Sequence, residues 1–427
     1  MTKVITYGTY DLLHRGHVRL LERAKALGDY LIVGVTSDDY DKTRGKINAS
    51  QSLMERVEAV RATGLADEIV VEEYEGQKID DIRRYGVDIF TVGSDWEGKF
   101  DYLNEYCKVV YLPRTEGVSS SEIRAKERTI RIGLLGSGSV VEKYKAECDF
   151  VNGLSVAWVC EGEAAYQSHL ADCDAVYIQS HARDHFRHIQ MALTAGKHVL
   201  CESPIALSET ESAKLFKLAS EKNLVLMDAI KTAYSTAYNR MLLLIKSGKI
   251  GKVMSVDATC TSLMEDYSSP EELASRQNSR CAWGPAALLA VLQILGTDYE
   301  SCNRTSFNAE GTSDFDIFSK YDFKYKDAVA TVKVGKGVKS EGELIVSGTK
   351  GYIYVPAPWW KTDYFEVRFE NPAENRRYFY QLDGEGIRAE LVAFVKGITQ
   401  GRRLSAIDSG VSSRIADLIG GCLCTNH

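Results

Sequence analysis

The stretch TYGTYDLLHRGHVRLLERAKALGDYLIVGV, residues 6–35, decides the fold of the first part of the chain. An apolar run is followed by an amphipathic helical pattern over residues 17–27 and by a second apolar run over residues 30–36. This succession predicts a strand, a helix and a parallel strand, the unit from which doubly wound sheets are built. Two of the chain's eight histidines, His14 and His17, stand three residues apart at the predicted turn.

Bulk composition favours a multidomain protein that binds small molecules. The 427 residues exceed what one hydrophobic core usually holds, and a net charge of −7 without a basic block argues against a nucleic-acid or membrane surface. The ten cysteines include no CxxC pair, which favours free thiols in a reducing compartment over a metal site. The chain enters a strand at once and contains no long apolar run, so we expect a cytoplasmic protein.

The alternation of apolar runs and helical patterns continues well beyond the first stretch. In the first part of the chain, strands are predicted over residues 3–8, 30–36, 68–71, 88–92 and 108–111, and helices over residues 17–27, 51–62, 77–84 and 119–127. In a second series, strands are predicted over residues 130–135, 154–159, 174–178, 197–200 and 223–227, and helices over residues 184–195 and 208–221. Both series predict parallel sheets.

From about residue 250 the pattern changes to longer alternating segments such as GKVMSVDATCTS and GELIVSGTKGYIYV, which indicate antiparallel strands. The fold class is therefore α/β: a doubly wound parallel sheet, a Rossmann-like sheet, and an α+β part with a mostly antiparallel sheet. We predict domains at 1–128, 129–250 and 251–427, with a helix at 385–399 as a candidate to pack back on the second.

The first strand-to-helix turn has the composition of a phosphate site. Ligands of doubly wound sheets bind beyond the carboxyl ends of the strands, where free N–H groups at a helix start attract anions. Gly8 and Thr9 allow the backbone to approach a ligand, and the two histidines bracket Gly16. Two imidazoles there can bind a phosphate and stabilise the charge that develops during substitution.

The segment GTYDLLHRGH resembles the GTFDxxHxGH signature of the cytidylyltransferase superfamily. Lys46 in RGKIN, VGSDWEGKFDYL at 92–103 and YLPRTEGVSSSEIR at 111–124 follow in the order of that family. The last two stretches resemble bacterial glycerol-3-phosphate cytidylyltransferases in particular. Together the motifs cover essentially all of residues 1–128.

The resemblance implies that a polyol phosphate attacks the α-phosphate of CTP in line, with Mg²⁺ bound to the triphosphate and pyrophosphate as the leaving group. It implies these catalytic residues: His14, His17, Lys46 and Arg114. It implies these nucleotide contacts: Gly8, Thr9, Gly16, Asp95, Arg114, Thr115, Ser119 and Ser120. It implies these acceptor contacts: Asp11, Arg56 and Tyr74. No protein ligand for a metal is assigned.

The remainder of the chain resembles a second family, the NAD(P)-dependent Gfo/Idh/MocA oxidoreductases. The resemblance rests on IRIGLLGSGSV, on DAVYIQSHARDHFRHIQMALTAGKHVLCESPIAL and on the segment that begins LVLMDAIKTAY. It implies a set of dinucleotide contacts: Gly136, Gly138, Glu161, Ser180, Glu202 and Pro204. Because no arginine follows Glu161, the cofactor is expected to be NAD(H) rather than NADP(H).

The second half of the chain departs from this family at the positions where the family has its cofactor-contacting and catalytic residues. The family's EKP lysine is replaced by Ser203, the third small residue of the glycine turn by Val141, and the motif aspartate by Ala290. The family's histidine or tyrosine falls at Gln293 or Ile294. A hydroxyl group does not carry the charge of an ammonium group, so the site is weakened.

The segment between the second and third strands of this series is short. Only about a dozen residues separate Glu161 from Asp172, where the family inserts a helix and another strand, which suggests that part of the adenosine pocket is missing. Two alternatives stay open for the second half. It is either a reductase that uses Lys231 or Tyr234 as its acid and makes the acceptor for the first half, or a binding or dimerisation module without hydride chemistry.

We therefore expect a cytoplasmic cytidylyltransferase that makes a CDP-glycerol-type product for cell-surface polymers such as capsule or teichoic acid. The alternatives are a bifunctional enzyme, an adenylyltransferase of the same superfamily and a non-catalytic nucleotide sensor. The acceptor is glycerol-3-phosphate, glycerol-2-phosphate or a longer polyol phosphate. A homodimer or higher homo-oligomer is expected, with neither nucleic acid nor membrane as a partner.

Overall fold

The computed structural model describes residues 1–37, 51–74, 76–113, 129–263, 273, 276–380, 382–401 and 405–421. The chain divides into two compact units. The first takes in Met1–Thr129 and the short segment Phe150–Gly153, and the second takes in Ile130–Asp149 and Leu154–His427. Among the described helices, none is long and apolar enough to cross a membrane.

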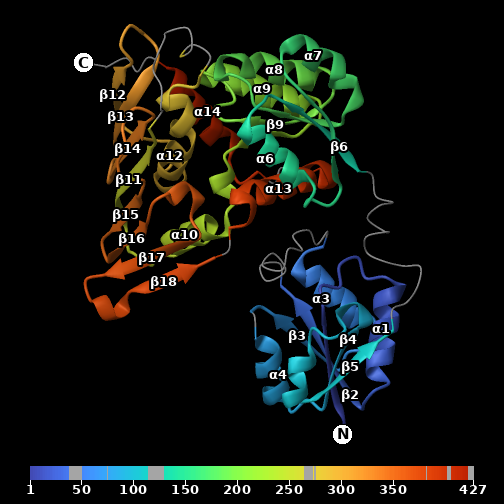
Figure 1. Ribbon diagram of the computed structural model, residues 1–427. Coiled ribbons are helices and arrows are strands. Elements are labelled where there is room, and N and C mark those ends of the chain that lie inside the picture. Colours follow the sequence, from blue (N-terminus) through green and yellow to red (C-terminus); the bar gives the residue numbers. More distant parts are fainter. Residues whose placement is uncertain are drawn as a thin grey trace. The chain divides into compact units, whose positions relative to one another are not determined.

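Five parallel strands form the sheet of the first unit, in the order β3-β2-β1-β4-β5 (Figure 1). The strands are β1 (Lys3–Gly8), β2 (Tyr30–Thr36), β3 (Glu68–Glu72), β4 (Ile89–Gly93) and β5 (Lys108–Leu112). The apolar runs of the inner strands β1, β2 and β4 are buried on both faces, as parallel strands between helices require, whereas the edge strands β3 and β5 are partly exposed. The chain reverses its winding direction at β1, which has β2 on one side and β4 on the other, and ligands of such sheets usually bind at the carboxyl ends of the strands at this point.

The described helices of the first unit are α1 (Arg15–Lys25), α3 (Leu53–Ala62) and α4 (Gln77–Tyr85), with short 3₁₀ segments η1 (Ser94–Trp96) and η2 (Asp101–Glu105). Two of these helices, α1 and α3, begin at a capping side chain, whereas α4 begins after Gly76 without one. Ser52 caps α3 through a capping box with Glu55, and His14 caps α1. The helix predicted at 119–127 lies outside the described residues.

A second parallel sheet opens the second unit, with the strand order β10-β9-β8-β6-β7. Its strands are β6 (Ile130–Leu135), β7 (Leu154–Cys160), β8 (Ala175–Ile178), β9 (His198–Glu202) and β10 (Leu226–Ala229). Its helices are α6 (Ser139–Cys148), α7 (Glu163–His169), α8 (Ala182–Thr194) and α9 (Glu209–Glu221). Between β7 and β8 the chain forms α7 and the 3₁₀ segment η3 (Leu170–Asp172), so a short helix is retained where the sequence suggested a loss.

The rest of the second unit is built on an eight-stranded sheet with the order β12-β13-β14-β11-β15-β16-β17-β18. These strands are β11 (Val253–Thr261), β12 (Ser301–Asn308), β13 (Asp316–Lys324), β14 (Val329–Gly335), β15 (Leu344–Gly348), β16 (Gly351–Val355), β17 (Tyr364–Phe369) and β18 (Arg376–Phe379). The pair β11 and β14 is parallel, and the other pairs are antiparallel, so the predicted antiparallel character holds for most of the sheet.

Helices and short helical turns connect this sheet to the parallel sheet of the same unit. They are η4 (Lys231–Tyr234), α10 (Thr236–Lys246), α12 (Ser279–Leu295), η5 (Trp359–Lys361), η6 (Pro372–Glu374), η7 (Asp383–Gly386), α13 (Ile387–Gln400) and α14 (Ser409–Gly420). The apolar helix α12 packs on β11, β13 and β14, whereas α13 lies against α6 (Figure 1). The side chains of α13 therefore reach the carboxyl end of the parallel sheet.

Candidate functional site

The turn after β1 is tightly folded. Tyr10 and Leu12 both adopt left-handed backbone angles, with φ of 53° and 48°. A Cβ atom at Gly8 would lie 3.0 Å from the ring of Tyr10, so glycine leaves room for that buried ring. Gln51 closes the turn, because its side-chain oxygen accepts from the Leu12 N–H at 2.9 Å and its own N–H donates to Asp11 at 3.0 Å. The backbone of the turn is thus fixed before any ligand binds.

The two imidazoles form a stacked pair at the start of α1. Their ring centroids lie 3.9 Å apart with an interplanar angle of 21°, and the Tyr10 ring contacts His17 edge-on at 5.6 Å. Nδ1 of His14 accepts the N–H of Gly16 at 3.1 Å. A neutral ring that accepts through Nδ1 carries its proton on Nε2, so we infer that His14 presents a donor to an anion at this helix start.

Asp11 and Arg56 are both buried, with 3% and 0% of their surface exposed. The guanidinium group of Arg56 donates to the carbonyl oxygens of Thr9 at 2.6 Å, of Thr36 at 2.8 Å and of Gln51 at 3.3 Å. Arg56 therefore holds together the backbone segments that follow β1 and end β2. Its predicted contact with an acceptor stays a prediction.

A buried polar network, which the sequence did not predict, lies at the carboxyl ends of β2 and β3. Thr36 donates to Glu72 at 2.9 Å, and Lys78 of α4 forms an ion pair with the same carboxylate. The Lys78 ammonium also lies 4.7 Å from the centroid of the Tyr7 ring, whose hydroxyl donates to Asp81 at 2.8 Å. Burial, followed by the nearby Asp81, raises the pKa of Tyr7. No short motif joins these residues, so only the fold reveals them.

The other predicted residues of the first unit fall into two groups. Asp95 lies exposed in η1, directly after β4, which pairs with β1. Tyr74 is exposed and donates to Asp80 at 2.8 Å, and this hydrogen bond is the largest cause of its raised pKa. Five predicted residues lie outside the described residues: Lys46, Arg114, Thr115, Ser119 and Ser120.

The glycine turn after β6 in the second unit has the shape of a dinucleotide site. Gly136 adopts φ of 131°, and a Cβ atom there would lie 2.2 Å from the Gln179 carbonyl oxygen, so only glycine fits. Gly138, with φ of 84°, is the N-terminal cap of α6 and offers no side chain to the first N–H groups of that helix. Val141 is buried in the first turn of α6, so the helix accommodates the larger residue. Glu161 is exposed immediately after β7.

Ser180 and Pro204 are linked by one buried imidazole. The Nε2 atom of His185 lies 3.0 Å from the carbonyl oxygen of Ser180. The Nδ1 atom of the same ring lies 2.8 Å from the carbonyl oxygen of Pro204. Burial lowers the pKa of His185 to about 4. The hydroxyl group of Ser180 lies 2.9 Å from Nδ1 of His188. These contacts fix the strand-end loops of β8 and β9 relative to each other.

Three carboxyl groups gather near the ends of β9 and β10. Tyr177 donates to Glu202 at 2.7 Å, and Tyr144 donates to Glu390 of α13 at 2.5 Å. The two tyrosine rings are stacked with centroids 3.9 Å apart. Burial is the largest cause of the raised pKa of both glutamates. The third carboxyl group, that of Asp228, is 1% exposed, and burial raises its pKa to about 7.

The two candidate acids of the second unit are already engaged. The Lys231 ammonium lies 2.8 Å from a carboxylate oxygen of Glu385. The hydroxyl group of Tyr234 lies 3.2 Å from that of Ser405 and is mostly buried, and burial is the largest cause of its raised pKa. Gln293, which stands near the family's histidine or tyrosine position, donates to the Ala406 carbonyl oxygen. Its amide is thus part of the structural hydrogen bonding.

Comparison with known proteins separates the two units. Residues 5–126 match the family described as cytidylyltransferase-like, and residues 131–229 match the oxidoreductase family with an NAD-binding Rossmann fold. A glycerol-3-phosphate cytidylyltransferase from Bacillus spizizenii is 49% identical over 124 residues, which are 29% of this chain and 95% of that protein. The protein of the same name from Staphylococcus aureus is 44% identical and is covered to 93%, again by 29% of this chain.

Solved structures resemble the second unit. The 3-ketoreductase KijD10 from Actinomadura kijaniata, in complex with NADP and TDP-benzene, aligns with a TM-score of 0.61 and 18% identity, covering 68% of this chain and 96% of its own. The UDP-N-acetylglucosamine 3-dehydrogenase GnnA from Acidithiobacillus ferrooxidans aligns with a TM-score of 0.56 and 18% identity, covering 68% and 95%. At this identity the likeness shows the fold. The chain therefore belongs, through its first unit, to the cytidylyltransferase family, and it carries in its second unit an oxidoreductase-family domain with an NAD-binding Rossmann fold.

Proposed function

We propose that the first unit transfers CMP from CTP to a glycerol phosphate, or to a related polyol phosphate, and releases pyrophosphate. The observation that carries this proposal is the stacked pair of His14 and His17 at a helix start beyond the central strand of a parallel sheet. Its support from comparison is the 49% identity to a glycerol-3-phosphate cytidylyltransferase over nearly the whole of that relative.

The proposed site residues of the first unit act in two ways, by neutralising phosphate charge and by positioning the nucleotide. His14 and His17 donate hydrogen bonds to the triphosphate, and Lys46 and Arg114 neutralise charge that builds on the phosphates. The backbone approaches the nucleotide at Gly8, Thr9 and Gly16. We propose four further nucleotide contacts, from Asp95, Thr115, Ser119 and Ser120. Positioning accounts for most of the rate, since in-line phosphoryl chemistry needs little else from the protein.

The acceptor and the metal complete the proposal. Asp11, Arg56 and Tyr74 are proposed on the acceptor side, with Arg56 acting through the backbone that it holds. Mg²⁺ would enter with CTP and neutralise phosphate charge. It would be held chiefly by phosphate oxygens, as Mg²⁺ usually is in sites that bind nucleotide phosphates.

We further propose that the second unit binds NAD(H). Support comes from the close approach at Gly136, where any side chain would clash with Gln179, and from the start of α6 at Gly138, where no side chain caps the first N–H groups. Glu161 is placed at the end of β7, where a carboxylate can bind a ribose hydroxyl, and Ser180, Glu202 and Pro204 line the neighbouring strand ends. The bound dinucleotide would supply hydride chemistry.

Hydride transfer itself is a second candidate function. Ser203 cannot replace a lysine as proton donor, which favours a binding or dimerisation module. The placement of Lys231 two residues after the end of β10, where its charge acts on Glu202, favours a working reductase that supplies the acceptor. In that case Lys231 or Tyr234 would hold the proton.

One screen separates these functions. Pyrophosphate release is measured with CTP or ATP against glycerol-3-phosphate, glycerol-2-phosphate and longer polyol phosphates, and NADH oxidation is measured with the corresponding keto compounds. Release with CTP alone supports the cytidylyltransferase, and release with ATP alone supports an adenylyltransferase. The absence of release with every nucleotide would refute the proposed activity in favour of a nucleotide sensor.

We propose a cytoplasmic setting and a homodimer or higher homo-oligomer. The excess of 59 acidic over 52 basic residues argues against a nucleic-acid or anionic membrane partner. The proposed product, an activated glycerol, suits the synthesis of a cell-surface polymer. Light scattering of the purified chain tests the oligomeric state directly.

A further inference from the structure

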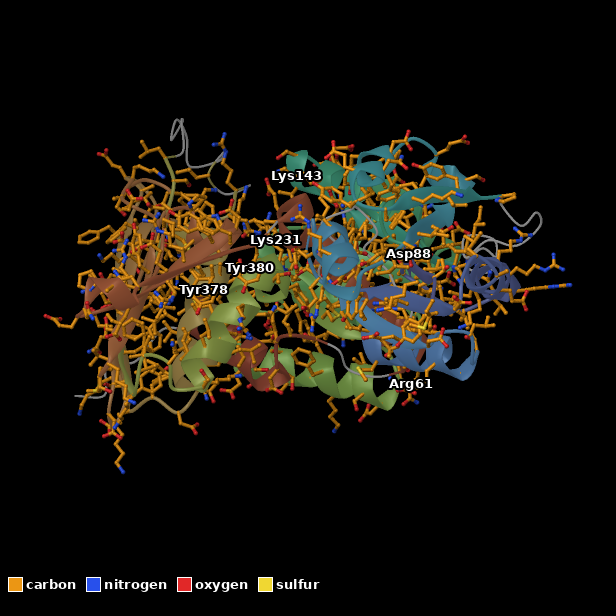
Figure 2. The ribbon with its side chains drawn as sticks, turned by 90° about the horizontal axis from the view of Figure 1, so that it is seen from below. Arg61, Asp88, Lys143, Lys231, Tyr378 and Tyr380 are labelled. Carbon is orange, nitrogen blue, oxygen red and sulfur yellow. The ribbon has the colours of Figure 1, made fainter. Side chains whose placement is uncertain are left out.

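Three lysines from separate elements of the second unit converge on one carboxylate. Lys143 of α6 lies 3.0 Å from one carboxylate oxygen of Glu385, while Lys231 of η4 at 2.8 Å and Lys361 of η5 at 3.0 Å share the other. Lys143 and Lys231 reach this place from different parts of the unit (Figure 2). The cluster joins the parallel sheet, through α6 and η4, to the eight-stranded sheet, through η5.

The charges of this lysine cluster are not balanced. Among the described side chains, three ammonium groups contact one carboxylate, so two positive charges have no contacting carboxylate of their own. Lys231 also interacts electrostatically with the buried carboxyl groups of Glu202 and Glu390. A further ion pair between Arg388 of α13 and Glu147 of α6, at 2.6 Å, is neutral in itself. Burial opposes ionisation of Glu385, but hydrogen bonds from the three lysines outweigh it and hold the pKa of that carboxyl group far below its ordinary value. The lysine cluster is thus an anion site with a protein carboxylate in it.

The shape of the donor set suits a phosphate better than a carboxylate. Glu385 offers two oxygens to three ammonium groups, so two lysines must share one oxygen. A phosphate monoester offers three terminal oxygens and close to two negative charges. If it took the place of the carboxylate, it would give each lysine its own acceptor and reduce the excess from two positive charges to about one.

The segment that carries Glu385 is held in an unusual conformation. Gly384, Glu385 and Gly386 all have left-handed backbone angles, with φ of 54°, 53° and 90°. Of the three, only Glu385 has a Cβ atom, so only this residue is sterically strained by a left-handed backbone angle. A Cβ atom at Gly384 would lie 2.4 Å from the Glu147 carboxylate, so the segment is closely packed. The strain indicates that the protein places this carboxylate among the lysines at some cost.

We propose that Lys143, Lys231 and Lys361 form a binding site for the phosphate monoester of a small ligand, and that Glu385 occupies this site until the ligand displaces it. The ligand class rests on the proposed function, since a phosphorylated polyol or its keto form carries this group. The site links the second unit to the same class of compound that the first unit would activate. The Glu385 carboxylate makes entry selective, because a weaker anion does not displace it.

Binding of inorganic phosphate and of glycerol phosphate to the full chain tests this site, with isothermal titration calorimetry as the readout. Lys361→Met should weaken phosphate binding on the order of tenfold, the scale for one hydrogen bond to a charged group. Lys252→Met is the matched control, because Lys252 pairs with Asp327 at the surface of the same unit, and it should leave binding unchanged. Glu385→Gln should tighten binding, an outcome that a misfolded variant cannot give.

Two further measurements distinguish the lysine site from the proposed nucleotide site of the first unit and from the proposed dinucleotide site. His17→Ala should leave this phosphate site intact, and pyrophosphate release from CTP should be the same in the parent and in Lys361→Met. NADH binding should be equal in the parent and in Lys361→Met. A parallel loss of NADH binding would assign the lysines to the dinucleotide and overturn the monoester site.

Equal phosphate affinity in the parent, Lys361→Met and Glu385→Gln would also overturn the proposal, as would loss of all phosphate binding in His17→Ala. Failure of the proposed function has a different signature. In that case no acceptor gives pyrophosphate release, whereas the phosphate affinity still changes in Lys361→Met and in Glu385→Gln. The lysine site would then be supported and the transferase activity refuted.

Discussion

The carboxyl group of Asp228 predicts an unusual pH dependence of stability. It lies in β10 with 1% of its surface exposed, beside the hydroxyl groups of Ser203 and Ser412. Neither of its oxygens has a hydrogen bond of standard geometry to a described residue. Burial raises its pKa from 3.8 to about 7, so the native protein keeps this proton at pH values where an unfolded chain has lost it.

The size and sign of the effect follow from linkage. Between pH 4 and pH 7 the native state binds more protons at this site than the unfolded state, so the free energy of unfolding falls as the pH rises. A shift of about three pH units corresponds to about 4 kcal/mol, of which about 3 kcal/mol is lost between pH 5 and pH 8. Asp228→Asn removes the titrating group and should abolish this loss.

The assay is urea unfolding at pH 5, 6, 7 and 8. Of the five tryptophans only Trp96 belongs to the first unit, so fluorescence reports mainly on the second. Relative to the parent, Asp228→Asn should gain about 3 kcal/mol of stability on going from pH 5 to pH 8. Asp149→Asn, at an exposed aspartate of the same unit, is the control and should follow the parent. Parallel pH profiles for the parent and Asp228→Asn would refute the reasoning.

Three further predictions concern the two proposed sites. His17→Ala should lower turnover of CTP on the order of 10²-fold with the fold intact, as measured by pyrophosphate release and circular dichroism, and unchanged turnover would contradict its role. Arg56→Met removes hydrogen bonds to three backbone carbonyl groups and should destabilise the first unit by about 2–4 kcal/mol in thermal unfolding, while Arg61→Met at an exposed position should stay within about 0.5 kcal/mol. Gly136→Ala should abolish NADH binding in a fluorescence titration, because its Cβ atom would meet a carbonyl oxygen, whereas Ser137→Ala should retain it.

The parallel sheets could be predicted from the sequence because their signal is local. Apolar runs such as those at 3–8 and 30–36 gave β1 and β2 with the same bounds, and the alternation with helices gave the parallel direction. Strand direction in the third sheet is not local. β11 pairs in parallel with β14 although both show the alternating pattern of antiparallel strands, and pattern alone does not distinguish the two cases.

The buried polar networks could not be predicted, since their members are far apart in the chain. Tyr144 and Glu390 are 246 positions apart, and Lys231 and Glu385 are 154 positions apart. Charged residues usually lie at the surface, so composition and periodicity favour exposure for each of them. Only the packing of α13 against α6 and η4 brings these groups together. The histidine motif on which the proposed site of the first unit rests could be recognised in the sequence for the opposite reason, because its residues are neighbours along the chain.

The spacing of His14 and His17 follows from the geometry of α1. His14 is the N-terminal cap, with extended backbone angles and its Nδ1 atom on the Gly16 N–H, and His17 lies three positions further, on the same face of the helix. That spacing lets the rings stack at 3.9 Å, so each limits the rotation of the other. One inserted residue would turn the second ring by about 100° around the helix axis and separate the pair. Gly16, one of the two residues between the histidines, adds no side chain at the helix start, so under the proposed function both imidazoles would act on the same phosphate.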